Sequence, residues 1–133
     1  MYVACLRNYS AQITHLAAHH PAVAVVGAGS RGEFRAEDQL CCAWIAAGLL
    51  AAGYEPQNER TVAIVERWRT MPVDTIVAGM SAEYLRKTGQ SRDLEYILTH
   101  IDDLNEVYRC ERGEVVKIAV EELVGENAGA PLW

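Results

Sequence analysis

The segment over residues 40–50 constrains the fold more than any other part of the sequence. It reads Leu-Cys-Cys-Ala-Trp-Ile-Ala-Ala-Gly-Leu-Leu, inside a helix that we expect over about residues 36–52 with Gly53 at the C′ position. A helix that is apolar on almost every side must be covered on almost every side. It is shorter than the roughly 20 apolar residues that a membrane-spanning helix needs. This chain or a partner must therefore bury it.

Two segments before this helix have the pattern of buried strands. Residues 2–6 form a short apolar run, and residues 22–26 read Ala-Val-Ala-Val-Val before a glycine. A run that is apolar on both faces is typical of a strand in a parallel sheet. Between them, Ser10 is the expected N-cap of a helix that ends near His19, because Pro21 stops it.

The remainder of the chain is predicted to be helical and then to close with a hairpin. Gly113 can take a positive φ between two strands, and Val116, Ile118 and Val120 alternate with Lys117 and Ala119 as in a half-exposed strand. The expected elements are helices over residues 59–71, 73–79, 82–88 and 91–100, hairpin strands over residues 105–110 and 114–120, and a loose tail over residues 121–133.

This order of elements predicts a layered α/β fold: strand-helix-strand-helix, then a helical segment and a C-terminal β-hairpin. We expect one domain over residues 1–120. Two parallel strands are few for so apolar a helix. We therefore expect the chain to be half of a larger α/β fold, or to gain strands from a partner chain.

The composition and charge of the chain argue against several classes of function. The chain is 50% hydrophobic and 23% charged, as in ordinary globular proteins, and its net charge is −6. Because it has no stripe of Lys and Arg, we expect no nucleic-acid partner. It has no signal peptide or membrane segment, so we expect a cytoplasmic protein with reduced cysteines. His15 and His19 lie four residues apart, but no third metal ligand stands near them in the sequence.

The glycine-rich turn after the second expected strand allows several interpretations. Residues 27–32, Gly-Ala-Gly-Ser-Arg-Gly, match the G-x-G-x-x-G pattern of dinucleotide-binding folds. The expected helix begins too late for that motif, however, and residues 54–58 form a loop where a second strand with an acid is required. A nucleophile elbow at Ser30 is the other alternative, with His100 as the only later histidine.

A cluster of charged residues follows this turn. Arg31 and Arg35 can pair with an anion, and the glycines expose backbone N–H groups at the end of a strand. Glu37 and Asp38 enter the first helical turn and can bind Mg²⁺ through carboxylate oxygens. An ordinary strand-loop-helix connection with acidic residues at the helix start explains the same pattern.

The residues Gly29-Ser30-Arg31-Gly32-Glu33-Phe34-Arg35-Ala36-Glu37-Asp38, between a strand and an apolar helix, resemble the 2-phosphosulfolactate phosphatase family. Residues 5–11, the pattern from Ser81 to Asp93 and the closing hairpin are also similar to segments of that family. The resemblance extends to about residue 118. It matches the C-terminal half of the longer family chains, because two motifs of their first half do not occur here.

The resemblance implies Mg²⁺-dependent hydrolysis of a small phosphomonoester, 2-phosphosulfolactate to sulfolactate and phosphate, a step toward coenzyme M. It implies that Glu37 and Asp38 hold the metal, that Arg31 stabilises the phosphoryl group, and that Glu33 orients water or an arginine. The implied substrate-binding residues are Arg7, Asn8, Gly29, Ser30, Gly32 and Arg35.

The resemblance also implies a partner, either further copies of this chain or a complementary N-terminal half. The sequence identifies no nucleophile. A second hypothesis therefore stays open, in which the chain is a non-catalytic assembly or anion-binding module.

Overall fold

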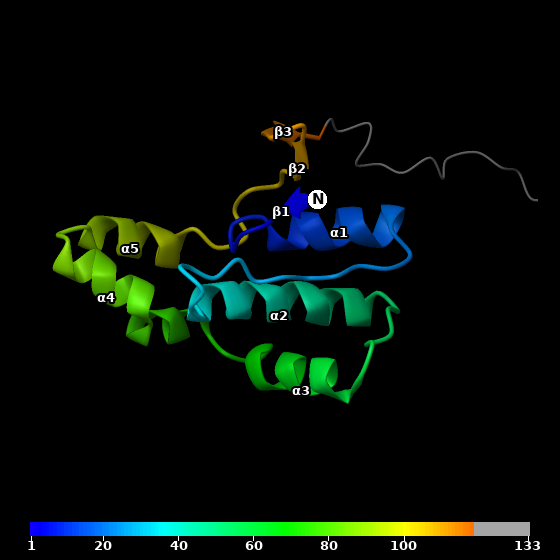
Figure 1. The fold of residues 1–133 in the computed structure, drawn as a ribbon, viewed down its shortest axis with the longest axis horizontal. Coiled ribbons are helices and arrows are strands. Elements are labelled where there is room, and N and C mark those ends of the chain that lie inside the picture. The colour runs from blue at the N-terminus through cyan, green and yellow to red at the C-terminus, as the bar shows by residue number, and fades with distance from the viewer. Residues whose placement is uncertain (119–133) are drawn as a thin grey trace, which may run out of the picture.

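The computed structural model describes residues 1–118, which form a mixed α/β fold, as expected (Figure 1). Helices make up most of it, and the short strands gather at one side. In chain order the elements are β1 (Tyr2–Val3), α1 (Tyr9–His19), α2 (Ala36–Ala51), α3 (Glu59–Trp68), the 3₁₀ helix η1 (Val73–Ala78), α4 (Met80–Lys87), α5 (Ser91–Thr99), β2 (Tyr108–Glu111) and β3 (Glu114–Lys117).

The sheet is antiparallel, so the predicted parallel sheet is wrong for the described residues. Its strand order is β1-β2-β3, with Tyr2 opposite Arg109 and Val3 opposite Tyr108. The first strand is also shorter than expected, because only two of its residues pair with β2. The first and last described strands are therefore joined through β2, which brings the N-terminus to the hairpin.

The C-terminal hairpin is confirmed. Arg112 has a φ of 49° and Gly113 a φ of 86°, the pair of left-handed conformations that a two-residue type I′ loop requires. The expected alternation holds as far as it can be followed, since Ile118 is buried and Lys117 exposed. Val120 and the expected tail over residues 121–133 lie outside the described residues.

The apolar helix α2 is confirmed and is the centre of the core. Leu40, Ile45 and Leu49 are almost fully buried in it, and Gly53 ends it with a φ of +98°. Among the described residues, α1, α3 and η1 all pack against this helix (Figure 1). The expected partner, either another copy of the chain or a complementary half, remains a prediction.

The connection between α5 and β2 contacts the start of α1. Ser10 is not the N-cap; instead its backbone N–H and its hydroxyl both donate to the carboxylate of Asp102. Asp102 has a φ of 52°, a left-handed conformation that Asp tolerates better than most residues. Next to it, Arg7 binds both oxygens of Asp103. The chain thereby ties α1 to the connection between α5 and β2.

The predicted second strand, residues 22–26, pairs with no other strand among the described residues. The segment runs between α1 and α2 (Figure 1), where Val23 and Val25 pack against the core and Val26 is 82% exposed. Its apolar sequence is that of a strand, but no described strand lies beside it to complete a ladder. No helix in the described part of the chain is long and apolar enough to cross a membrane.

Candidate functional site

The glycine turn forms a tight hairpin that projects from the start of α2. The backbone N–H of Ser30 donates to Glu33 O at 3.1 Å, and the N–H of Glu33 donates back to Ser30 O at 2.9 Å. Between them, Arg31 has a φ of 54° and Gly32 a φ of 77°. Both central residues are therefore left-handed, as a type I′ turn requires. The turn holds Arg31 at its tip, where its side chain is exposed.

Asp38 anchors this turn to α2. Its Oδ2 accepts a hydrogen bond from the Gly29 backbone N–H at 2.7 Å, a charge-assisted bond in a part-buried position. Gly27 lies close to the same helix, since a Cβ there would be 3.5 Å from the Asp38 Cβ and 3.6 Å from the Cys42 Sγ. Asp38 therefore lies beside the glycine turn and holds it through this backbone contact.

Glu37 faces a different neighbour, the start of α4. The Ser81 hydroxyl donates to its Oε1, and a Cβ at Gly79 would lie 3.9 Å from its Oε2. Position 37 is in the first turn of α2 and position 81 in the first turn of α4, so two helix N-termini meet at this carboxylate. The partial positive charge of both helix starts favours an anion there.

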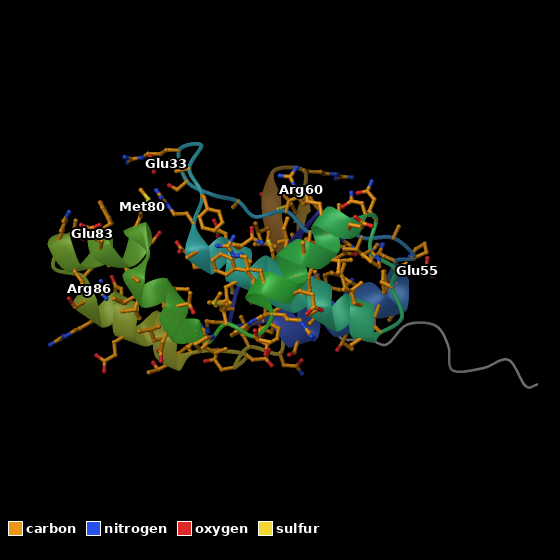
Figure 2. The ribbon with its side chains drawn as sticks, turned by 90° about the horizontal axis from the view of Figure 1, so that it is seen from below. Glu33, Glu55, Arg60, Met80, Glu83 and Arg86 are labelled. Atoms are coloured by element: carbon orange, nitrogen blue, oxygen red, sulfur yellow. The ribbon has the colours of Figure 1, made fainter. Side chains whose placement is uncertain are left out.

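Arg35 and Glu33 form an ion pair on the side of the turn that faces α4. The Arg35 Nη1 lies 3.2 Å from the Glu33 Oε2 and 3.4 Å from the Met80 Sδ. The Arg35 side chain is 13% exposed, whereas that of Glu33 is 56% exposed. Figure 2 shows Glu33 on the projecting turn, with Met80 and Glu83 on α4 below it. The Arg35 side chain is therefore mostly buried, whereas the Glu33 carboxylate is exposed to solvent while it pairs with Arg35.

Arg31 has no hydrogen bond or ion pair with any described residue. Its guanidinium sits on an exposed turn next to backbone N–H groups, an arrangement suited to an anion. Of the predicted residues, only Glu33 and Arg35 contact each other through their side chains. Asp38 contacts the turn through the Gly29 N–H, and Glu37 contacts Ser81 of α4.

Two other predicted site residues are engaged in different contacts. The Arg7 guanidinium binds Asp103 and the Tyr96 hydroxyl. Asn8 is 1% exposed; its Oδ1 accepts from the Cys5 backbone N–H and its Nδ2 donates to Glu106 O. Both side chains connect the N-terminal segment to α5 and to the connection between α5 and β2. Their role in substrate binding remains a prediction.

The residues present fit Mg²⁺ only where one or two carboxylates bind it and water or substrate supplies the other ligands. No group of three or more His, Cys, Asp or Glu side chains gathers as a metal site within residues 1–118. Glu37 and Asp38 each use one carboxylate oxygen in a hydrogen bond and keep the other. Mg²⁺ is often bound by one or two carboxylates together with waters and substrate phosphates, so this donor set is sufficient for that mode.

Neither cysteine beside the turn is suited to act as a nucleophile. Burial raises the pKa of the Cys41 thiol to about 12, and burial also raises the pKa of the Cys42 thiol. The thiolate is the reactive form of cysteine. Both groups are therefore protonated near neutral pH and serve as core residues, as the sequence predicted.

Sequence reasoning did not assign Ser81 or Met80 to this region. Both lie at the start of α4, more than 40 positions from the turn, and come close to it only because the first turn of α4 meets the start of α2. The sequence marks this place only by Gly79, which stands directly before α4. The structure gives a reason for the glycine, because a Cβ there would lie 3.0 Å from the Ile76 carbonyl oxygen.

Comparison with known proteins gives one finding. The model of the family described as 2-phosphosulpholactate phosphatase matches residues 1–112 of the 133-residue chain. No curated protein and no solved structure matches the chain. The matched range contains the whole glycine turn, Glu37, Asp38 and Ser81.

Proposed function

Because the chain belongs to the 2-phosphosulfolactate phosphatase family, we propose that the turn over residues 29–38 forms the phosphate-binding part of a phosphomonoester hydrolase. The proposed reaction is hydrolysis of 2-phosphosulfolactate to sulfolactate and phosphate. The observation that carries this proposal is the unpaired Arg31 guanidinium on a turn whose backbone is fixed by Asp38. Enzymes of phosphoryl transfer stabilise the negative charge of the phosphoryl group with cationic side chains on a rigid backbone, and this turn offers such a side chain.

Each residue of the turn has a role in this proposal. The Arg31 side chain and the backbone N–H groups of Arg31 and Gly32, which no described residue uses, bind phosphate oxygens and stabilise the charge that develops during transfer. Glu33, which is exposed and tied only to Arg35, orients water or the arginine. Arg35 holds Glu33 in reach, so it acts by positioning.

Magnesium is part of the proposal through Glu37 and Asp38. Each keeps one carboxylate oxygen that no described residue uses. When bound, the ion would supply positive charge to the phosphate oxygens. The residues of this chain would bind it, keep it at the start of α2, and leave the remaining coordination positions to water and phosphate.

We further propose that this chain is one part of a larger site. The described residues supply cations and carboxylates but no activated nucleophile, and residues that act as a unit contribute far less when only some are present. The missing part would come from another copy of the chain or from a complementary N-terminal half. The chain alone is therefore expected to be a poor phosphatase.

The test is a phosphate-release assay with 2-phosphosulfolactate, with and without Mg²⁺, on the chain alone and mixed with a separately produced N-terminal half of a family member. We expect Mg²⁺-dependent turnover in the mixture. Glu37→Gln and Arg31→Gln should each lower it at least about tenfold. Glu83→Gln is the control, because that carboxylate pairs only with Lys87 on the exposed face of α4.

A second candidate is a non-catalytic anion-binding module. The absence of a three-carboxylate cluster from residues 1–118 favours it, since Arg31 and the turn can bind phosphate without a metal. Phosphate binding measured by calorimetry that is unaffected by Mg²⁺ and lost in Arg31→Gln, without turnover in any mixture, would support the module. Turnover in the mixture would exclude it.

A further inference from the structure

We propose that residues 22–28 are an acceptor strand, which binds an extended segment of a separate polypeptide along the edge that faces β1. The observation behind this is a row of backbone groups without partners. Among the described residues, no backbone or side-chain group makes a hydrogen bond with the N–H or C=O groups of residues 21–28. A row of N–H and C=O groups without partners along an extended segment is a template on which another chain can pair.

The sequence of this segment is that of a sheet strand. Val23 and Val25 face the core, whereas Ala22, Ala24 and Val26 are exposed on the opposite face. The segment carries no charge and no proline after Pro21. Natural proteins protect an edge of this kind with charges, proline or a covering element, because it pairs readily with another chain. None of these devices protects residues 22–28.

A cavity of about 370 Å³ lies along this edge. Its walls include β1 at Tyr2, residues 22–28, and α2 at Cys41 and Ile45. Gln12 also lines it; this side chain is 1% exposed, and neither its amide nitrogen nor its amide oxygen has a partner. A buried amide without partners is destabilising, because nothing compensates for the desolvation of its donor and acceptor. The cavity therefore offers an unsatisfied donor and acceptor beside an unsatisfied strand edge.

These features identify the occupant as an extended backbone. A helix satisfies its own backbone groups and a small ligand cannot pair with a whole row, whereas a strand offers alternating donors and acceptors that match both the edge and the Gln12 amide. Because the walls are mainly apolar, the occupant should carry small or β-branched apolar side chains. Strand addition to a free edge is a common mode of peptide recognition.

A separate polypeptide fits this site better than the same segment of a second copy. In a second copy, residues 22–28 would be fixed to that copy's own core through Val23 and Val25. The segment could not enter the cavity unless its helices came with it. An occupant that enters would end beside Asp38, which also lines the cavity. It would thereby bring side chains to the glycine turn; that last step alone rests on the proposed function.

The experiment measures amide hydrogen exchange by NMR on the full chain, with a synthetic peptide as probe. The probe is acetylated, amidated Lys-Val-Ala-Val-Thr-Val-Lys; its control is N-methylated at every second residue and cannot complete a ladder. We expect the probe to slow exchange at least about tenfold at alternate residues of 22–28, because successive N–H groups point to opposite edges of a strand. The methylated peptide should leave exchange unchanged.

Three variants outside the glycine turn sharpen this test. Ala24→Pro removes a backbone N–H from an exposed position and should abolish the protection, whereas Ala24→Val should retain it. Gln12→Leu should weaken probe binding about tenfold. The proposal is overturned if the probe leaves exchange at residues 22–28 unchanged, or if both peptides act alike. It is also overturned if these amides are protected without probe in a dimer whose population rises with protein concentration. No readout is catalytic, so failure of the phosphatase proposal would leave these results intact.

Discussion

Gly29 is the residue on which the geometry of the glycine turn depends most. Its φ is +64°, and a Cβ there would lie 2.9 Å from the Glu33 carbonyl oxygen. Gly29→Ala therefore adds a backbone clash to the cost of a left-handed conformation, and we expect a loss of about 2–3 kcal/mol in the free energy of unfolding. Urea denaturation measures this loss.

Gly32→Ala is the matched control for that substitution. Gly32 is also left-handed, with a φ of +77°, but nothing lies within 4 Å of its Cβ position. It should cost only about 1 kcal/mol, the conformational part alone. Equal losses for the two variants would show that the contact with Glu33 does not restrict the turn.

Two buried amide side chains in the N-terminal region should respond oppositely to the same substitution. The Gln12 side-chain amide has no hydrogen-bond partner among the described residues, so Gln12→Leu should stabilise the isolated chain by about 1–3 kcal/mol. Asn8 makes two hydrogen bonds, to the Cys5 N–H and to Glu106 O, so Asn8→Leu should destabilise it by about 2 kcal/mol or more. Thermal unfolding of both variants under one condition decides this. Destabilisation by Gln12→Leu would mean that the amide already has a partner in solution.

At the scale of elements, the contact between α1 and α2 is set by a glycine. A Cβ at Gly48 would lie 2.4 Å from the Ile13 Cδ1 and 3.0 Å from its Cγ1. Gly48→Ala gains about 1 kcal/mol of helix propensity but forces overpacking that costs about 1–3 kcal/mol. We therefore expect a net loss of stability in the wild-type background.

The sign of that effect should reverse when Ile13 is shortened. In an Ile13→Ala background the clash is absent, so Gly48→Ala should stabilise by about 1 kcal/mol. Free energies of unfolding for the two single variants and the double variant form a complete cycle. Additive effects would show that the two helices do not meet at Gly48.

At the scale of the whole molecule, Arg7 and Asp103 join the N-terminal segment to the connection between α5 and β2. The Arg7 guanidinium lowers the pKa of Asp103, chiefly through their hydrogen bond. A carboxyl group whose pKa is lower in the folded state stabilises the fold above its unfolded pKa of about 4 and loses that contribution as the pH falls.

The difference in stability between wild type and Arg7→Gln should therefore be largest above about pH 5 and shrink as the pH falls below about 4. Urea unfolding of both proteins over this range is the measurement. Arg60→Gln is the matched control for removal of an arginine, since Arg60 is exposed on α3 and has no ion pair with a described residue. If the difference in free energy of unfolding between wild type and Arg7→Gln does not change with pH, the Arg7–Asp103 pair does not stabilise the fold in this way.

Local chemistry was sufficient to predict most of the elements. The apolar run over residues 40–50, the glycine at position 53 and the alternation of Val116 and Ile118 each specify a structure through neighbours a few positions away. The hairpin turn at Gly113 follows from the same short-range rule. The charged residues of the glycine turn were also predictable, because they lie within ten consecutive positions.

Pairing and packing were decided only by the tertiary structure. Residues 22–26 have the sequence of a strand, but a ladder needs a neighbour, and the described chain places none beside them. Ser81 reaches Glu37 only because α4 packs against the start of α2. Asp102 replaces Ser10 as the group that fixes the start of α1, from more than 90 positions away. Such contacts depend on which elements meet in space, and no periodicity within a single segment records that.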